Sequence, residues 1–460
     1  MEYYKEYTDV DLSNLKEWER SVIEILKEAV KACGEIYALQ KNSDCPGGNF
    51  YPCDVTKEKI EEAGKLNPDI FSPYSIVEIG KNGELVAVMY SVKFKDEIAK
   101  ICEELEKVAP LYDQNGFSLY ASYLKQLSSD LKSDNYEESE KLWLKIDWKV
   151  KVDIKLGPIE TYQDKLFGVK KAFQANLRVS DNVDAGQIGD YIDLAYALAS
   201  YSKLDKANSV GSEKNLIVRI DKVVAMSGWH ADLVPRTSNY PADISHIVYG
   251  SKVIVYTNNI SLKQKMISEI ISEMFLLPDS DLRGNFDLSA IRVATLHEIA
   301  ETVSKQEHTN EYGNFGDLED SFVELNADMA AIKIASHQVL KGVFSAEDYK
   351  LLIIEFIAGA LRGWIYGKSG ASGLRTFSDG YKVILNLLIK EKAIKITVEN
   401  KLEIDLSGVY THVDILNKNL HSYLIAHDKD SVEKLFADYE SEDELNKLSR
   451  SLESIVFRKD

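Results

Sequence analysis

The sequence is poor in the features that mark membrane, secreted or repetitive proteins. It has no uninterrupted apolar run of about 18 residues, so no segment is predicted to span a bilayer. Its 9 prolines and 25 glycines among 460 residues are too few for a collagen-like or low-complexity chain. The first residues lack the basic start and apolar stretch of a signal peptide, which favours a cytoplasmic location.

Cysteine is also scarce, because Cys33, Cys45, Cys53 and Cys102 are the only four. This number is too small for a disulfide scaffold. Cys45 and Cys53 frame a loop but lack the Cys-x-x-Cys spacing of a zinc ribbon. We therefore expect reduced thiols in a cytoplasmic protein.

Positive charge is in deficit. The chain has 74 acidic and 55 basic residues, a formal net charge of −19, which argues against a nucleic-acid partner because phosphates need a basic surface. Hydrophobic residues make up 45% and charged residues 28%, as in an ordinary globular protein. At about 100–200 residues per domain, this length predicts two or three domains.

The spacing of apolar residues predicts a chain with two differently built parts. In the first part, helices are predicted at 15–41, 56–63 and 94–148, a hairpin at 75–90, and strands at 149–154, 172–178, 215–224 and 252–256. In the second part, helices are predicted at 261–275, 288–305, 319–340, 345–366, 376–391, 412–425 and 429–455, with a short hairpin at 393–405. The expected fold class is α+β, with a mixed lobe at 1–260 and a mainly helical lobe at 261–460.

One of these helices carries a pattern typical of metal chemistry, His297-Glu298-Ile299-Ala300-Glu301. His297 and Glu301 are four residues apart and share a helix face, while Glu298 is offset by one position. Zincins carry two ligands one turn apart, and the glutamate next to the first ligand polarises a metal-bound water as general base. A glutamate stands here for the usual second histidine, and zinc accepts carboxylate oxygen as well as imidazole nitrogen.

The next predicted helix offers a complementary pair, Glu324 and Asp328. Glu324 suits a further zinc ligand. Asp328 suits an acceptor for the other ring N–H of a ligating histidine, which would fix its tautomer. Histidine–glutamate pairs are also common by chance on acidic helices, so the motif by itself leaves a purely structural role open.

The wider chain resembles the dipeptidyl-peptidase III family, particularly its bacterial branch. The resemblance is carried by residues 156–173 (LGPIETYQDKLFGVKKAF) and by further stretches in the same order. These are Tyr51-Pro52 with Asp54 and Thr56-Lys57-Glu58, then Asn239-Tyr240-Pro241-Ala242-Asp243, Gly250 to Asn258, the His297 helix, the Glu324 helix, and Asn386-Leu387-Leu388.

This resemblance implies a two-lobed zinc exopeptidase with a wide cleft, whose helical lobe bears the metal. Members of the family release dipeptides from the N-terminus of short oligopeptides. By similarity, His297 and Glu324 are zinc ligands and Glu298 is the general base. Asn239 and Asp243 fall in a stretch that contacts peptide. Glu160 and Tyr162 lie in the 156–173 segment, where a structural role and a functional role stay equally open.

Three departures from the family pattern stand out. Glu301 and Thr302 occupy the positions where its second histidine is found. Phe377 aligns with a histidine that stabilises the transition state, and loss of such a donor typically costs a factor of about 10²–10³ in rate. Val323 stands at a position before Glu324 that is often acidic. His308 is expected to be a surface residue beyond the helix end rather than a replacement ligand.

Two functions therefore stay open. The first is a zinc-dependent exopeptidase that releases dipeptides, with one ion held by His297, Glu324 and Glu301, and with Glu298 activating a water. The second is a catalytically inactive dipeptidyl-peptidase III-like protein that binds a peptide or a protein partner. In either case we expect a monomer or dimer with a short peptide as substrate or ligand, and with no nucleic acid and no membrane as partner.

Overall fold

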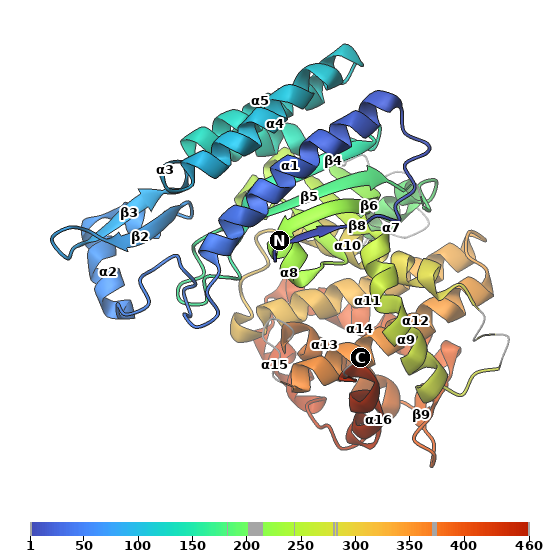
Figure 1. The fold of residues 1–460 in the computed structure, drawn as a ribbon. Helices are drawn as coiled ribbons and strands as arrows, with labels where there is room; N and C mark the ends of the chain where they lie inside the picture. Colours follow the sequence, from blue (N-terminus) through green and yellow to red (C-terminus); the bar gives the residue numbers. More distant parts are fainter. Residues whose placement is uncertain are drawn as a thin grey trace. The chain divides into compact units, whose positions relative to one another are not determined.

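The structure is a computed structural model that describes residues 2–181, 183–200, 215–242, 244–278, 281, 284–369 and 375–458. The chain divides into two compact units. Unit 1 comprises Met1–Val183 and Ile217–Asn259, and unit 2 comprises Asp184–Leu216 and Ile260–Asp460. The expected α+β class is confirmed, because unit 1 combines helices with a large sheet and unit 2 is mainly helical (Figure 1). The expected cleft stays a prediction.

Unit 1 contains the mixed elements. In chain order they are β1 (Tyr4–Glu6), α1 (Glu17–Gln40), α2 (Lys57–Leu66), the 3-10 helix η1 (Pro68–Phe71), β2 (Ser75–Ile79), β3 (Leu85–Met89), α3 (Tyr90–Lys93), α4 (Lys95–Gln114), α5 (Ser118–Ser133), α6 (Glu137–Leu144), β4 (Val152–Glu160), β5 (Ala172–Ser180), β6 (Leu216–Gly228), α8 (Trp229–Leu233), β7 (Thr237–Tyr240), η3 (Ile244–Tyr249) and β8 (Ser251–Tyr256). The predicted helix at 15–41 and the hairpin at 75–90 correspond closely to α1 and to β2 with β3.

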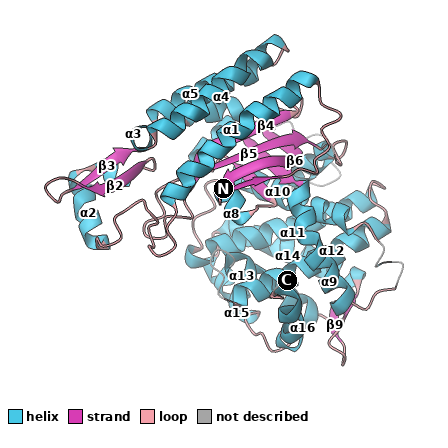
Figure 2. Cartoon of the chain, viewed as in Figure 1, coloured by secondary structure: helices cyan, strands magenta, loops and turns pink. Residues whose placement is uncertain are grey.

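The sheet of unit 1 has the strand order β4-β5-β6-β8-β7, and β1 pairs with β6 outside this path. β4 and β5 are antiparallel and nearly every residue of both strands is buried. Such continuous burial means that both faces of these strands are covered by other parts of the chain. α1 packs against β4 and β5, and α4 packs against α1 and α5 (Figure 2).

β4 is longer than the sequence indicated. It begins at Val152 and continues through Pro158 to Glu160, whereas the predicted strand covered 149–154. Proline normally argues against a central strand because it has no N–H to donate. β4 lies at the edge of the sheet, where one side of the strand needs no ladder partner, so Pro158 is tolerated.

Tyrosine hydroxyls cover part of the free edge of β4. The hydroxyl of Tyr112 donates to Val152 O at 2.6 Å, and that of Tyr123 donates to Ile154 O at 2.9 Å. The Ile154 N–H donates to the Tyr120 hydroxyl at 2.8 Å. Buried backbone groups need such partners, so α4 and α5 protect this edge from pairing with another strand.

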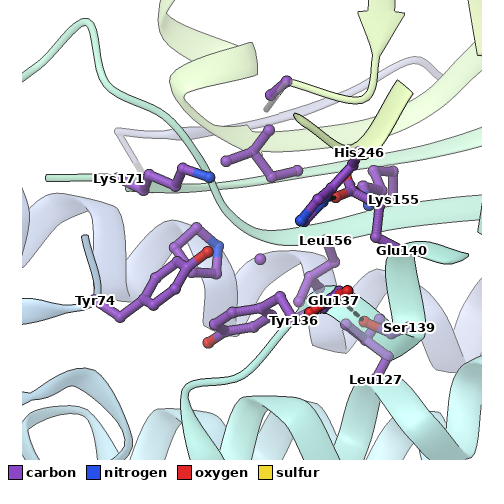
Figure 3. A pocket seen from close by; sticks show the side chains of 14 residues that line it. Tyr74, Leu127, Tyr136, Glu137, Ser139, Glu140, Lys155, Leu156, Lys171 and His246 are labelled. Atoms are coloured by element: carbon purple, nitrogen blue, oxygen red, sulfur yellow. Dashed lines mark hydrogen bonds and ion pairs between the residues drawn. The ribbon is translucent and has the colours of Figure 1, made fainter. Parts of the chain in front are cut away.

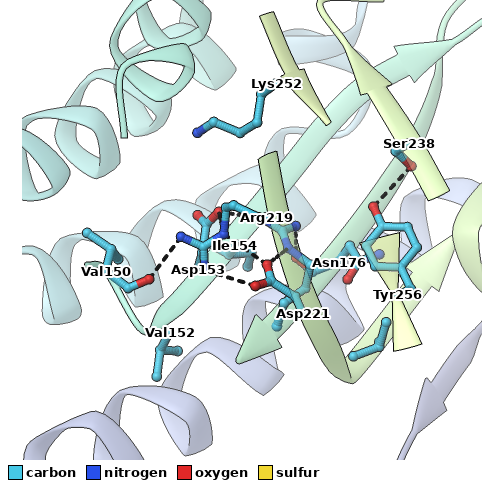
Figure 4. A network of polar contacts seen from close by, with 12 residues as sticks. Val150, Val152, Asp153, Ile154, Asn176, Arg219, Asp221, Ser238, Lys252 and Tyr256 are labelled. Carbon is cyan, nitrogen blue, oxygen red and sulfur yellow. Dashed lines mark hydrogen bonds and ion pairs between the residues drawn. The ribbon is translucent and has the colours of Figure 1, made fainter. Parts of the chain in front are cut away.

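Four of the buried charged side chains on the sheet of unit 1 form a network, part of which Figure 4 shows. Arg178 forms ion pairs with Asp153 and with Asp221, the latter at 3.2 Å, and Arg219 Nε lies 2.9 Å from Asp221 Oδ2. All four side chains are fully buried. Burial by itself would raise the pKa of Asp153, but Arg178 and Arg219 outweigh it and lower that pKa to about 2. The network therefore remains ionised in the core.

The loop between β4 and β5 is organised by one carboxylate. Asp164 is buried and accepts hydrogen bonds from the backbone N–H groups of residues further along the loop, which are Leu166, Phe167, Val169 and Lys170, at 2.9–3.2 Å. The Tyr51 hydroxyl donates to the same carboxylate at 3.3 Å. Asp164, which belongs to the 156–173 segment, therefore has a structural role in holding this loop.

Two of the four cysteines are joined in a disulfide, contrary to what the sequence led us to expect. Cys45 and Cys53 form a disulfide with their Cα atoms 5.6 Å apart, so the expectation of reduced thiols is wrong for this pair. The loop turns back on itself, since Gly48 N–H donates to Cys45 O at 2.9 Å. Cys33 and Cys102 are buried free thiols, as expected.

Unit 2 contains most of the remaining helices. They are α7 (Ile188–Ala199), α9 (Thr257–Met274), α10 (Phe286–Glu307), the 3-10 helix η5 (Gly316–Leu318), α11 (Glu319–Leu340), α12 (Ala346–Lys368), α13 (Arg375–Lys390), α14 (Leu406–Ala426), α15 (Lys429–Asp438) and α16 (Asn446–Val456), with the short hairpin β9 (Ile394–Ile396) and β10 (Leu402–Ile404). α7 packs on α10 and α11, so a segment that precedes residue 260 belongs to the helical unit. Within the described part of the chain, no helix is both long and apolar enough to cross a membrane.

The last predicted helix, 429–455, is wrong as a single element, because α15 ends at Asp438 and α16 begins at Asn446. The Asn386 side chain donates to Tyr439 O at 2.8 Å and to Ser441 O at 2.7 Å. These bonds take up carbonyl groups that a continuous helix would use. The acidic run at 440–444 also disfavours a helix through like-charge repulsion.

Candidate metal site

α10 begins where the sequence provides a cap, since the Asn285 side chain accepts the Leu288 N–H at 3.1 Å. Midway along this helix, His297, Glu298 and Glu301 present a nitrogen and two carboxylate oxygens that all lie within 4.8 Å of one another. The three side chains are partly or largely buried. The helical spacing therefore gathers the donors that the sequence singled out.

α11 packs against α10 and brings two more carboxylates to the same imidazole. Asp328 Oδ1 lies 2.7 Å from His297 Nδ1, and Glu324 Oε2 lies 3.2 Å from His297 Nε2. Glu324 and Asp328 are four residues apart and share one helix face. Each ring nitrogen of His297 thus faces a different carboxylate of α11.

The charges around His297 act on one another strongly. Burial would lower the pKa of His297, but Asp328 and Glu324 outweigh it and raise that pKa well above its usual value. Burial raises the pKa of Glu324 to about 7, aided by the charge of Glu301 and opposed by the contact with His297. Without a bound metal ion, His297 and Glu324 therefore hold protons more tightly than they would in water.

The Glu324 carboxylate faces His297 in a geometry that does not form a regular hydrogen bond. Its Oε2 is buried and makes no hydrogen bond within the described residues, even though His297 Nε2 is 3.2 Å away. In the neutral tautomer whose Nδ1–H donates a hydrogen bond to Asp328, Nε2 presents a lone pair toward Glu324, and the two electron-rich atoms need a proton or another cation between them. A cation shared by both atoms would satisfy them.

The distances agree with such a cation. Two ligands bound tetrahedrally to one zinc at about 2.0–2.1 Å are about 3.3 Å apart, and Nε2 and Oε2 are 3.2 Å apart. Zinc accepts both imidazole nitrogen and carboxylate oxygen. The residues present therefore fit a divalent cation, with His297 and Glu324 as the best-placed pair.

The carboxylate that replaces the second histidine has a partner of its own. Glu301 is largely buried, and its Oε1 lies 2.5 Å from the ammonium of Lys305, one turn further along α10. Lys305 was not among the candidate residues that the sequence indicated. Its spacing of four residues from Glu301 is the signal that could have identified it.

Residues outside this cluster lie in other environments. His308 is 7% exposed at the end of α10, where its Nε2 lies 2.9 Å from Ala199 O, so the expectation of a surface residue is wrong. Its ring centroid lies 5.3 Å from that of His421. Phe377 lies in α13, with its ring centroid 6.4 Å from that of Tyr381. His308 does not join the His297 cluster found among the described residues.

The predicted peptide contacts belong to unit 1. Asn239 lies in β7, and Asp243 falls outside the described residues. Glu160 ends β4, and burial raises its pKa to about 7 although the nearby Lys171 lowers it. Tyr162 is 62% exposed and stacks on Trp229, with ring centroids 5.4 Å apart.

A separate small pocket lies in unit 1 beside β4 (Figure 3). Its lining includes Tyr74, Tyr136, Lys155, Lys171 and His246, and its volume is about 40 Å³. This volume has room for roughly three water molecules, which is far too little for a peptide. Burial lowers the pKa of Lys155 there, while the nearby Glu140 raises it.

Solved structures share this architecture. Dipeptidyl-peptidase III from Caldithrix abyssi matches with a TM-score of 0.83 at 20% identity, over 97% of this chain and 94% of that one. The chain has the dipeptidyl-peptidase III fold. A second dipeptidyl-peptidase III, from Corallococcus sp. strain EGB, matches with a TM-score of 0.71 at 20% identity, over 98% of this chain and 96% of that one.

The resemblance predicted from the sequence is therefore confirmed for the dipeptidyl-peptidase III fold. No family model matches the chain. Among curated proteins, Nudix hydrolase 3 of Arabidopsis thaliana is 21% identical over 461 residues, which cover 91% of this chain. The match covers 58% of that relative, so this chain spans less than two thirds of its length.

Proposed function

We propose that the chain is a zinc-dependent exopeptidase that releases dipeptides from the N-terminus of short oligopeptides. The observation that carries this proposal is the imidazole of His297 held between Asp328 on one nitrogen and Glu324 on the other. The dipeptidyl-peptidase III fold supports it. His297 and Glu324, together with Glu301, would hold one zinc ion, which when bound supplies a Lewis acid for water and the peptide carbonyl.

Other side chains of this chain would orient the histidine, transfer the proton and bind the peptide. Asp328 accepts the Nδ1–H of His297, which fixes the tautomer and leaves the Nε2 lone pair for the metal. The carboxylate of Glu298 accepts a proton from the attacking water and can return it to the leaving nitrogen. Asn239 and Asp243 would bind the peptide main chain.

Dipeptide release from an unmodified five-residue peptide, followed by mass spectrometry, tests this proposal. We expect zinc-dependent loss of two N-terminal residues that is abolished by chelator and reduced at least about 100-fold in Glu298→Gln. Glu307→Gln, at the exposed end of the same helix, is the matched control and should keep the activity. A folded wild-type protein that cleaves none of a panel of peptides with any divalent metal would rule out the peptidase.

A second function is favoured by the ion pair between Glu301 and Lys305 and by Phe377, which stands where the family has a histidine. Here the protein binds peptide or a protein partner without cleaving it. This alternative predicts that isothermal titration detects peptide binding that is unchanged in Glu298→Gln and unaffected by chelator. Turnover by the wild-type protein would exclude it.

A further inference from the structure

The ion pair between Glu301 and Lys305 places an internal cation at the edge of the candidate metal site. Lys305 Nζ lies 2.5 Å from Glu301 Oε1, and the side chains are 37% and 10% exposed. Glutamate four residues before lysine is the favourable order on a helix. Because the carboxylate is largely buried, solvent and salt screen this pair less than a surface pair.

Lys305 also interacts electrostatically with the other acidic groups of the cluster. The carboxylate of Glu301 above all, followed by those of Glu324 and Glu298, attracts the Lys305 ammonium. The ammonium therefore lies within the electrostatic reach of the carboxylates that would face a metal ion.

A metal ion at this site and the Lys305 ammonium would both bind the Glu301 carboxylate. Glu301 shares its helix face with His297, and their donor atoms lie within 4.8 Å of each other and of a Glu298 oxygen. A carboxylate that gives its electron density to a divalent cation binds an ammonium less strongly. The ammonium also repels a divalent cation directly.

We propose that the Lys305 ammonium competes with the metal for Glu301 and thereby sets how tightly this site holds zinc. The proposal rests on the metal site put forward above, but it concerns affinity rather than turnover. A histidine in place of Glu301 would have no such interaction with lysine. The Glu301–Lys305 pair therefore weakens zinc binding, so that a higher zinc concentration is needed to fill the site, and Lys305 is a positioning residue.

Zinc affinity of the metal-free full chain, measured by isothermal titration and by equilibrium dialysis with metal analysis, tests the proposal without any substrate. Lys305→Met should bind zinc about 10-fold more tightly than the wild type. Lys305→Arg keeps the charge and should stay within about 3-fold of the wild type. Lys418→Met is the matched control, because Lys418 pairs with Asp414 at the same spacing in α14, 2.7 Å apart.

A double-mutant cycle with Glu301→Gln separates competition for this carboxylate from general repulsion. The gain produced by Lys305→Met should be largely lost in the Glu301→Gln background, because only the direct repulsion between the ammonium and the metal remains there. An unchanged or weaker affinity in Lys305→Met, or a gain that persists undiminished without Glu301, would overturn the proposal. Failure of both the wild type and Lys305→Met to bind zinc, with normal circular dichroism, would also overturn it.

These outcomes differ from those of the peptidase test. Tighter zinc binding by Lys305→Met without any cleavage would support the competition and reject the exopeptidase. Cleavage by the wild type with no effect of Lys305→Met on zinc affinity would support the exopeptidase and reject the competition.

Discussion

Asp328 Oδ1 lies 2.7 Å from His297 Nδ1, so α11 orients the imidazole that α10 carries. The contact joins two helices whose residues are 31 positions apart in the chain. It fixes which nitrogen keeps a proton and which nitrogen is free to bind a cation.

The first prediction follows from this contact. Asp328→Asn should lower zinc affinity about 10–100-fold, because the amide is a weaker acceptor and no longer stabilises the correct tautomer. Isothermal titration of the folded variant measures this change. Asp320→Asn, at the exposed start of the same helix, is the control. Equal zinc affinity in both variants would contradict the orienting role of Asp328.

The second prediction concerns the buried charges of unit 1. Asp153→Asn should reduce the free energy of unfolding by about 3–5 kcal/mol, because it leaves Arg178 and Arg219 without a full counter-charge in the core. Urea unfolding followed by circular dichroism measures the loss. Asp147→Asn, whose side chain is 41% exposed, should change stability by less than about 0.5 kcal/mol. If Asp153→Asn lowered the free energy of unfolding as little as the control does, Asp153 would not be an important counter-charge for the two buried arginines.

The third prediction concerns pH. The folded pKa of Glu160 is about 7, and the unfolded value is near 4.3. Since the folded state holds the proton more tightly, this group should lower stability as pH rises from about 4 to 7. Relative to wild type, the free energy of unfolding of Glu160→Gln should therefore rise by about 2–3 kcal/mol between pH 5 and pH 8. Urea titrations at both values check this.

Glu62→Gln, an exposed site in α2, is the control for the pH measurement and should follow the wild type at both pH values. A Glu160→Gln variant with the same pH dependence as wild type would show that burial does not raise this pKa.

The fourth prediction concerns the loop that follows β4. Asp164→Ala removes an acceptor shared by several backbone N–H groups and should cost at least about 2 kcal/mol of unfolding free energy. It should also speed proteolysis between β4 and β5. Asp54→Ala, at an exposed position, should do neither. Proteolysis rates as slow as those of the control would mean that other contacts order this loop.

Local patterns predicted much of the secondary structure. The periodic spacing that buries one side of α1, and the hairpin of β2 and β3, depend on neighbouring residues alone. The break between α15 and α16 was missed because Asn386, which binds carbonyl groups there, comes from another helix. The disulfide was missed because spacing does not reveal when two cysteines meet.

By itself, the sequence determined which donors share the α10 face, because a spacing of four residues places His297 and Glu301 on one side of any helix. Only the tertiary structure decided which partners they meet. Packing of α11 on α10 brings Glu324 and Asp328 to the two nitrogens of His297. The burial that packing creates, and not the order of residues, raises the pKa of Glu324 to about 7.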